Sequence, residues 1–224
     1  MKKLLKPIIM IDGLLGCGKT ILAKYLADAT NSTAIHGDVL MADSAMNNSD
    51  KLFERFGTTP AEQGGLREFV HKIAINVKAA YDFMECVRPG VEELVVQIIK
   101  ELENGNQHKV NPNSIYNYSG NSNAYIVEFI TSSAFKELWN TANERYVIIA
   151  LLEKILANSK ARGRSDDAFE TTINKFDARM PIVMRAKNVD YTIINQHDNV
   201  DLFIKSAGRV IIPQIKKTMR QRHS

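Results

Sequence analysis

The sequence predicts a three-layer α/β fold, in which helices flank a parallel β-sheet within a single domain. Short runs rich in isoleucine and valine alternate with segments of helical periodicity. The glycine-rich segment "GLLGCGKT" (13–20) lies between the first apolar run and the first helical pattern. The length of 224 residues suits one domain of ordinary to large size with a core of its own.

The first half of the predicted fold begins with "PIIMID" (7–12), an isoleucine-rich run that indicates a strand buried on both faces. The segment "TILAKYLADA" (20–29) predicts a helix, because its apolar residues are spaced for one helical face. A second short strand is expected at "TAIHG" (33–37), followed by a helix that starts near Val39.

The rest of the chain continues the same alternation. Residues 49–102 are mostly helical in composition, with patterns at 69–84 and 90–102. Residues 103–123 are rich in asparagine, serine and glycine and show no periodicity, so we expect a long surface loop or insertion there. Three further buried strands are predicted at "AYIVEFI" (124–130), "RYVIIAL" (145–151) and "VDYTIIN" (189–195).

The segment 13–20 fits the pattern G-x-x-x-x-G-K-[ST], and the strand before it and the helix after it supply the context of a phosphate-binding P-loop. Glycines let the backbone N–H groups approach phosphates, and the following helix adds its positive end. The predicted ATP-binding residues of this loop are Gly13, Leu14, Leu15, Gly16, Cys17, Gly18, Lys19 and Thr20. Lys19 would reach the β- and γ-phosphates, and the Thr20 hydroxyl would bind Mg²⁺.

Other motifs argue against two classes of P-loop protein. A GTPase should contain D-x-x-G, which does not occur, and N-K-x-D, for which "NQHD" (195–198) has glutamine in place of lysine. A motor or helicase would need more chain and an acidic strand end of Walker B type. Glu128 in "IVEFI" is the nearest approach to that feature, and we expect it to lie at a strand end near the acceptor.

Two stretches favour a kinase that acts on a small molecule. Asp38 follows the second predicted strand, where it would orient the hydroxyl proton of an acceptor; its alternative role is the N-cap of the next helix. The segment 160–176 has two arginines in a glycine-containing stretch followed by acidic residues, and it resembles the lid of nucleoside monophosphate kinases. This resemblance implies that Arg162 and Arg164 close over the transferring phosphate. Alternatively, these arginines form surface salt bridges with Asp166 or Asp167.

The order of these motifs resembles dephospho-CoA kinase, a family of the adenylate-kinase-like group of P-loop kinases. The resemblance is carried by "GLLGCGKT" (13–20), "HGDVLMAD" (36–43), "LFERFGTT" (52–59), "GLREFV" (65–70), "VRPGVEEL" (87–94), which is similar to a helix start in the family, and the closing stretch 177–203. Asp38 then falls on the family's proposed base. His36 replaces the first aspartate of the family's D-x-D, Arg88 replaces the histidine of its H-P, and "GRSDD" is more similar to the lid of adenylate and uridylate kinases.

The resemblance implies transfer of the γ-phosphoryl group of Mg-ATP to the ribose 3′-hydroxyl of dephospho-CoA, giving CoA and ADP. The implied catalytic residues are Lys19, Asp38 and Arg162; Arg162 and Arg164 would also contact ATP, and Asp38, Arg67, Arg88 and Glu128 would face the acceptor. We expect the core to comprise about 1–48 and 124–224, the acceptor-binding insertion about 49–102 and the lid about 160–167. The alternatives are a nucleoside or deoxynucleoside monophosphate kinase and a non-catalytic nucleotide-binding regulatory protein.

The composition sets the expected surroundings of the chain. A formal net charge of +4 and a pI near 9.0 suit a polyanionic ligand, and we interpret the basic tail as a solvated helix end, with no nucleic-acid partner. Two cysteines are too few for a disulfide framework, which indicates the cytoplasm. We expect no membrane partner, because no apolar stretch is long enough to span a bilayer, and a monomer or small homo-oligomer.

Overall fold

The computed structural model describes residues 4–14, 16–73, 76–109, 117–118, 122–130, 132–161 and 186–223. Its five-stranded sheet has the order β2-β5-β1-β6-β7, and every neighbouring pair is parallel. The strands are β1 (Ile8–Gly13), β2 (Thr33–His36), β5 (Tyr125–Phe129), β6 (Glu144–Ala150) and β7 (Tyr191–Asn195). All five coincide with predicted strands to within two residues at each end, and the α/β fold class is confirmed.

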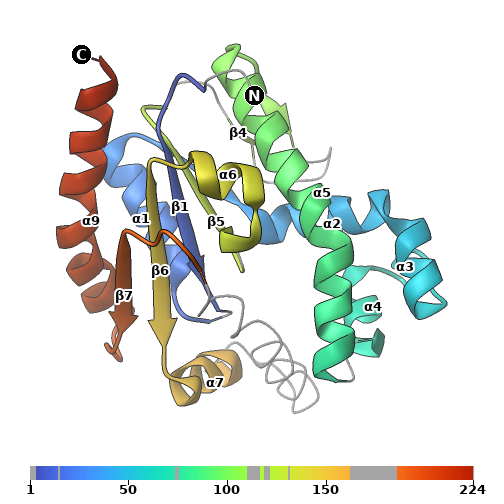
Figure 1. Ribbon diagram of the computed structural model, residues 1–224. Helices are drawn as coiled ribbons and strands as arrows, with labels where there is room; N and C mark the ends of the chain where they lie inside the picture. The colour runs from blue at the N-terminus through green and yellow to red at the C-terminus, as the bar shows by residue number, and fades with distance from the viewer. Residues whose placement is uncertain are drawn as a thin grey trace.

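Helices cover both faces of this sheet (Figure 1), with α6 in front of it and α1 behind it, where α9 packs against α1. The described helices are α1 (Lys19–Thr30), α2 (Gly37–Asn47), α3 (Ser49–Phe56), α4 (Leu66–Ile73), α5 (Val77–Glu103), α6 (Lys136–Thr141), α7 (Leu152–Ala161) and α9 (Val200–His223). β1 is buried along its whole length, as expected for a central parallel strand. Edge strand β7 instead alternates between partly buried and exposed residues until Asn195.

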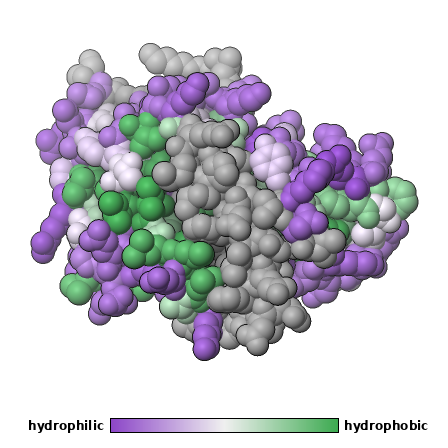
Figure 2. All heavy atoms as spheres, turned by 60° about the horizontal axis from the view of Figure 1, so that its bottom comes forward, coloured by the Kyte–Doolittle hydropathy of each residue, from purple (hydrophilic) through white to green (hydrophobic). Residues whose placement is uncertain are grey.

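The parallel arrangement brings the carboxyl ends of β1, β2, β5, β6 and β7 to one edge of the sheet (Figure 1). The glycine loop, the start of α2 and the end of β5 therefore meet there, where ligands bind in open α/β sheets. Figure 2 views this end of the molecule and shows apolar side chains gathered on one side of it. Leu151, Ile194, Val200 and Leu202, just after β6, in β7 and at the start of α9, are exposed apolar residues.

The long helix α5 corrects the expected helix start at Arg88 and Pro89. The helix begins at Val77, where the Asn76 side chain accepts a hydrogen bond from the Ala79 N–H group, and it continues through Pro89. An interior proline removes one helical hydrogen bond and normally breaks a helix. Here close packing against α2 holds the two halves together: the Ser44 hydroxyl donates to the Val87 carbonyl.

The asparagine-rich segment 103–123 differs from the loop predicted for it. Helix α5 ends at Glu103, and two short strands follow, β3 (His108–Lys109) and β4 (Asn117–Tyr118), which pair antiparallel. Two residues per strand are too few to produce a periodic pattern, so these strands could not be predicted from the sequence.

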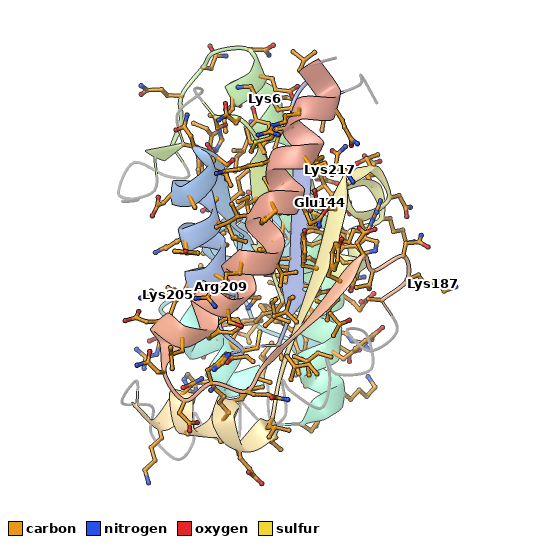
Figure 3. The ribbon with its side chains drawn as sticks, turned by 90° about the vertical axis from the view of Figure 1, so that its left-hand side faces the viewer. Lys6, Glu144, Lys187, Lys205, Arg209 and Lys217 are labelled. Carbon is orange, nitrogen blue, oxygen red and sulfur yellow. The ribbon has the colours of Figure 1, made fainter. Side chains whose placement is uncertain are left out.

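Helix α9 confirms the interpretation of the basic tail as a helix. Figure 3 views the side of the molecule on which α9 lies and labels Lys205, Arg209 and Lys217 along it. These three side chains are exposed, whereas Phe203 and Ile211 belong to the core. Among the described residues, no helix is both long and apolar enough to cross a membrane.

Candidate nucleotide-binding site

The loop between β1 and α1 has the backbone of an anion-binding turn. Gly18 is the N-cap residue of α1 with φ +100°, and no side chain caps this helix, so its first N–H groups point to the space in front of the loop. A Cβ atom on Gly18 would lie 2.8 Å from the Phe203 ring. The glycine is therefore required both by its dihedral angle and by its packing.

The carboxylate of Asp12, at the end of β1, accepts two backbone hydrogen bonds where the loop begins. The Gly13 N–H group donates to Asp12 Oδ1 over 2.7 Å, and the Ser133 N–H group donates to Oδ2 over 2.8 Å. The side chain of Asp12 is fully buried. Sequence reasoning took "PIIMID" only as a strand and missed this role; a charged residue at the end of an apolar run was the available signal.

The Lys19 side chain is buried in a cluster of charged and polar groups. Its Nζ atom lies 3.8 Å from Glu128 Oε2, and its side chain is 3% exposed. Glu128, which is 1% exposed, also accepts a hydrogen bond from the Thr20 hydroxyl (3.2 Å) and lies 2.9 Å from His36 Nδ1. The adjacent ends of β1, β2 and β5 therefore place a lysine and a histidine in contact with one carboxylate.

Opposite charges stabilise this cluster against the cost of burial. Burial alone would lower the pKa of Lys19, but the carboxylates of Asp38 and Glu128 outweigh burial and raise the pKa above its usual value. Burial would likewise raise the pKa of Glu128, and the Lys19 ammonium, helped by His36 and Thr20, lowers it instead. Both groups are therefore charged near neutral pH.

Asp38 lies in the first turn of α2, half-buried and close enough to Lys19 to raise the pKa of its ammonium group. The alternative that Asp38 caps this helix is wrong: α2 begins at Gly37, and its N-cap residue is His36. A Cβ atom on Gly37 would lie 2.7 Å from the Phe129 side chain, so only glycine lets the helix start this close to β5. The early start turns Asp38 into a residue of the first turn.

The Cys17 thiol is a buried part of the loop. It is fully inaccessible to solvent, and burial raises its pKa to about 11 even though Lys19 acts in the opposite direction. The side chain packs beneath the loop, because a Cβ atom on Gly13 would lie 2.7 Å from Cys17 Sγ. Cys17 can therefore contribute only its backbone to a ligand in front of the loop.

The predicted acceptor residues on the helical region lie on separate helices. Arg67 is an exposed residue of α4. Arg88, in α5, forms an ion pair with Glu85 at 2.5 Å. Their contact with an acceptor stays a prediction. Leu15 of the loop and the lid arginines Arg162 and Arg164 lie outside the described residues, as do most of residues 160–167.

The oxygen atoms of Thr20 and Glu128 fit a magnesium ion. Mg²⁺ prefers oxygen ligands and usually takes one or two from the protein, with phosphates and water supplying the others. Glu128 Oε2 is buried and makes no hydrogen bond within the described part of the chain, so it has capacity for a further partner. Within that part, no group of three or more histidine, cysteine, aspartate or glutamate side chains could hold a metal by itself.

Comparisons with known proteins agree on the fold. No protein-family model matches the sequence, and no curated protein matches it. The structure is similar to TT1252 from Thermus thermophilus, with a TM-score of 0.59, 18% identity, and coverage of 93% of this chain and 97% of that one.

Two weaker similarities involve kinases. Dephospho-CoA kinase from Campylobacter jejuni is 17% identical, with a TM-score of 0.49 and coverage of 94% of this chain and 98% of that one. Shikimate kinase from Acinetobacter baumannii is 11% identical, with a TM-score of 0.48 and coverage of 93% and 94%. At sequence identities this low, structural similarity shows a shared fold and not a shared function. The TT1252 similarity therefore supports the three-layer α/β architecture that the sequence predicts.

Proposed function

We propose that this protein is an ATP-dependent P-loop kinase that phosphorylates a nucleotide-like acceptor. The observation that carries the proposal is the cluster at the sheet edge, where the Lys19 ammonium group contacts the buried carboxylate of Glu128. The charge of the half-buried Asp38 also helps to raise the pKa of Lys19. A lysine held in this way beside open helix N–H groups suits the phosphates of a nucleoside triphosphate.

In the proposed reaction the acceptor hydroxyl oxygen attacks the γ-phosphorus of ATP. A new P–O bond forms to the acceptor, the bond to the β–γ bridging oxygen breaks, and ADP leaves. Asp38 would accept the hydroxyl proton, which requires that a carboxylate oxygen be reachable by the acceptor. The residue is partly exposed, although its Oδ1 atom is buried. Lys19 and the loop N–H groups would balance the charge that develops on the phosphate oxygens.

Thr20 and Glu128 would bind the magnesium ion of Mg-ATP. Glu128 is 1% exposed and contacts Thr20, which suits a residue beneath the phosphates better than one facing the acceptor. A Mg²⁺ ion held by Thr20 and Glu128 would offset the negative charge of the nucleotide phosphates. The lid role of Arg162 and Arg164 is part of the proposal on the strength of the sequence pattern alone.

The favoured acceptor is the ribose 3′-hydroxyl of dephospho-CoA, with Arg67 and Arg88 facing acceptor phosphates. The support is the order of motifs in the sequence, in particular the segment 36–43 that contains Asp38. The competing acceptors are nucleoside and deoxynucleoside monophosphates, which the lid-like sequence "GRSDD" favours. The proposed location is the cytoplasm.

An assay of ADP release separates these acceptors. The purified protein, with Mg-ATP, is tested against dephospho-CoA, a panel of nucleoside and deoxynucleoside monophosphates, and no acceptor. Turnover with dephospho-CoA above the acceptor-free rate is the expected result, and mass spectrometry should identify CoA as the product. Turnover only with a monophosphate would overturn the dephospho-CoA assignment, while nucleotide binding without transfer to any acceptor would favour a regulatory protein.

A further inference from the structure

Two asparagine side chains outside the P-loop hold carbonyl groups of its backbone. Asn158 Nδ2, from α7, donates to the Gly16 carbonyl oxygen over 3.0 Å. Asn195 Nδ2, from the last residue of β7, donates to the Cys17 carbonyl oxygen over 2.9 Å. The two contacts join consecutive peptide groups of the loop to two elements that follow it by more than a hundred residues in the sequence.

Holding these carbonyls determines where the neighbouring N–H groups point. In a trans peptide the C=O and N–H bonds point in opposite directions. The Cys17 carbonyl faces Asn195, so the Gly18 N–H group points away from Asn195. The Gly16 carbonyl faces Asn158, and the N–H group of the same peptide, that of Cys17, points back to the Leu14 carbonyl at 3.3 Å. Both carbonyl oxygens are thereby directed into protein contacts.

The orientation needs such contacts because the loop backbone is unusually free. Gly16 and Gly18 both have positive φ, at 81° and 100°, and a peptide group next to glycine can turn over at little steric cost. A carbonyl oxygen turned into the cradle would repel phosphate oxygens. Specific hydrogen bonds to these carbonyls therefore select the state of the loop that can bind an anion.

Asn195 is itself held firmly. Its side chain is 5% exposed, and it packs against the loop so closely that a Cβ atom on Gly18 would lie 3.2 Å from Nδ2. Its Oδ1 atom is buried and makes no hydrogen bond within the described residues, so the donor alone ties this amide to the loop. Asn158 is less enclosed, being partly exposed on α7.

We propose that Asn158 and Asn195 are positioning residues for phosphate binding. Both keep a loop carbonyl oxygen, that of Gly16 or Cys17, out of the space where phosphates would bind, and Asn195 thereby also directs the Gly18 N–H group toward that space. The inference rests on the proposed function, since it concerns the site of that function. The proposal also gives a role to Asn195, the first residue of "NQHD", in a chain that lacks the complete base-reading motif of a GTPase. That asparagine contacts the loop and acts through it.

The test compares ligands with and without phosphates. Asn195→Asp and Asn158→Asp keep the side-chain shape and replace the amide donor with a carboxylate oxygen that faces a carbonyl oxygen. We expect each variant to bind Mg-ADP roughly tenfold more weakly than the wild type, the loss expected for one backbone hydrogen bond in such a site. Adenosine binding should stay within twofold, because adenosine does not contact the N–H groups that the carbonyls orient.

Two controls separate positioning from folding. Asn76→Asp makes the same chemical change at the start of α5, where the side chain accepts a hydrogen bond from Ala79 N–H and a carboxylate can do the same, so Mg-ADP affinity should not change. Asn158→Gln keeps an amide donor on a partly exposed side chain and should recover most of the lost affinity. Thermal unfolding of every variant is measured, and if Asn195→Asp does not fold, Asn158→Asp decides the test.

Three results would overturn the inference. Wild-type affinity for Mg-ADP in the aspartate variants would show that the carbonyl contacts do not order the loop, while leaving the proposed function intact. An equal loss of ADP and adenosine affinity would indicate general damage to the site. Failure of the wild-type protein itself to bind Mg-ADP and Mg-ATP would overturn the proposed function, and the inference with it.

Discussion

The two carboxylates beside Lys19 differ in what they can reach. Glu128 is enclosed by Lys19, Thr20 and His36, whereas Asp38 is partly exposed at the start of α2. A general base must be able to meet a proton on the acceptor, and a charge that offsets a buried lysine need not. This difference in burial is the basis for the proposed division of roles, in which Asp38 would face the acceptor and Glu128 would lie beneath the phosphates.

The first prediction tests the role of Asp38 in proton transfer. Asp38→Asn should reduce kcat by about 10²- to 10⁴-fold, because the amide has no basic oxygen, and leave Mg-ATP affinity within a few-fold of wild type. Steady-state ADP release and direct nucleotide binding measure the two effects. Asp43→Asn, in the same helix and also partly buried, is the matched control and should keep normal turnover. Full activity of Asp38→Asn would contradict the assignment.

A second prediction concerns the Cys17 thiol. Because its pKa is about 11 and its side chain is fully buried, it should resist iodoacetamide at pH 8 in the folded protein. Mass spectrometry after digestion should find more label on the half-buried Cys86 and label on both residues after denaturation. Labelling of Cys17 in the native protein as fast as in the denatured protein would contradict the burial.

The same thiol predicts the sign of a pH effect on stability. Its pKa is higher in the folded state than the usual 9.0, so its contribution is fully present below about pH 9 and is lost as the pH rises toward 11. Wild type should therefore lose stability relative to Cys17→Ala over this alkaline range. Denaturant unfolding at several pH values measures the difference, and a constant difference would contradict the prediction.

Single residues were predictable where a local pattern defines their chemistry. The phosphate- and metal-binding roles of Lys19 and Thr20 can be predicted from the glycine motif, because both residues lie directly next to the loop in the sequence. The contacts of Glu128 with both residues depend on β5 lying next to β1, and a single sequence does not specify strand order. The same reason explains why Asn158 and Asn195 were missed as partners of the loop.

At the scale of elements, a carboxylate on α5 joins that helix to α6. Glu92 Oε1 accepts hydrogen bonds from the N–H groups of Glu137 (2.8 Å) and Leu138 (3.0 Å), at the start of α6. The N-cap residue of α6, Phe135, makes no such bond with its side chain. A residue from another helix thus satisfies N–H groups that a short helix leaves open.

The fourth prediction removes this cap. Glu92→Ala should lower the free energy of unfolding by about 1–2 kcal/mol, since two N–H groups lose their acceptor near a helix N-terminus. Glu93→Ala, one position along and exposed, is the matched control and should change stability by less than about 0.5 kcal/mol. Chemical denaturation compares the two. Equal effects of both substitutions would contradict the capping role.

The elements themselves were predicted well where packing and local pattern agree. The five strands of the sheet and helix α1 have patterns that one sequence shows directly. The long helix α5 was predicted as separate patterns at 69–84 and 90–102, with a helix start near Pro89 implied by the family resemblance. The packing against α2 that lets the helix continue through Pro89 is not visible in a local pattern. Tertiary contacts decided the outcome there.

Over the whole molecule, the nucleotide site lies where separate parts of the fold meet. The loop joins β1 to α1, Glu128 comes from β5, His36 from β2 and Asn195 from β7. Helix α9 packs against α1, and its Phe203 ring lies against Gly18 of the loop. A ligand bound to this loop therefore contacts, directly or through one residue, most strands of the sheet, and its binding energy should stabilise the entire domain.

The fifth prediction follows from this arrangement. Mg-ATP at about 100 times its Kd should add roughly 2.7 kcal/mol of stability, which for a domain of this size corresponds to a rise in Tm of about 5–10 °C. Thermal unfolding with and without nucleotide measures it. Lys19→Ala should fold but show little of this rise, because the buried ammonium group that meets the phosphates is gone, and chelation of Mg²⁺ should reduce the rise in the wild type. The same rise in wild type and Lys19→Ala would show that the nucleotide binds elsewhere on the chain.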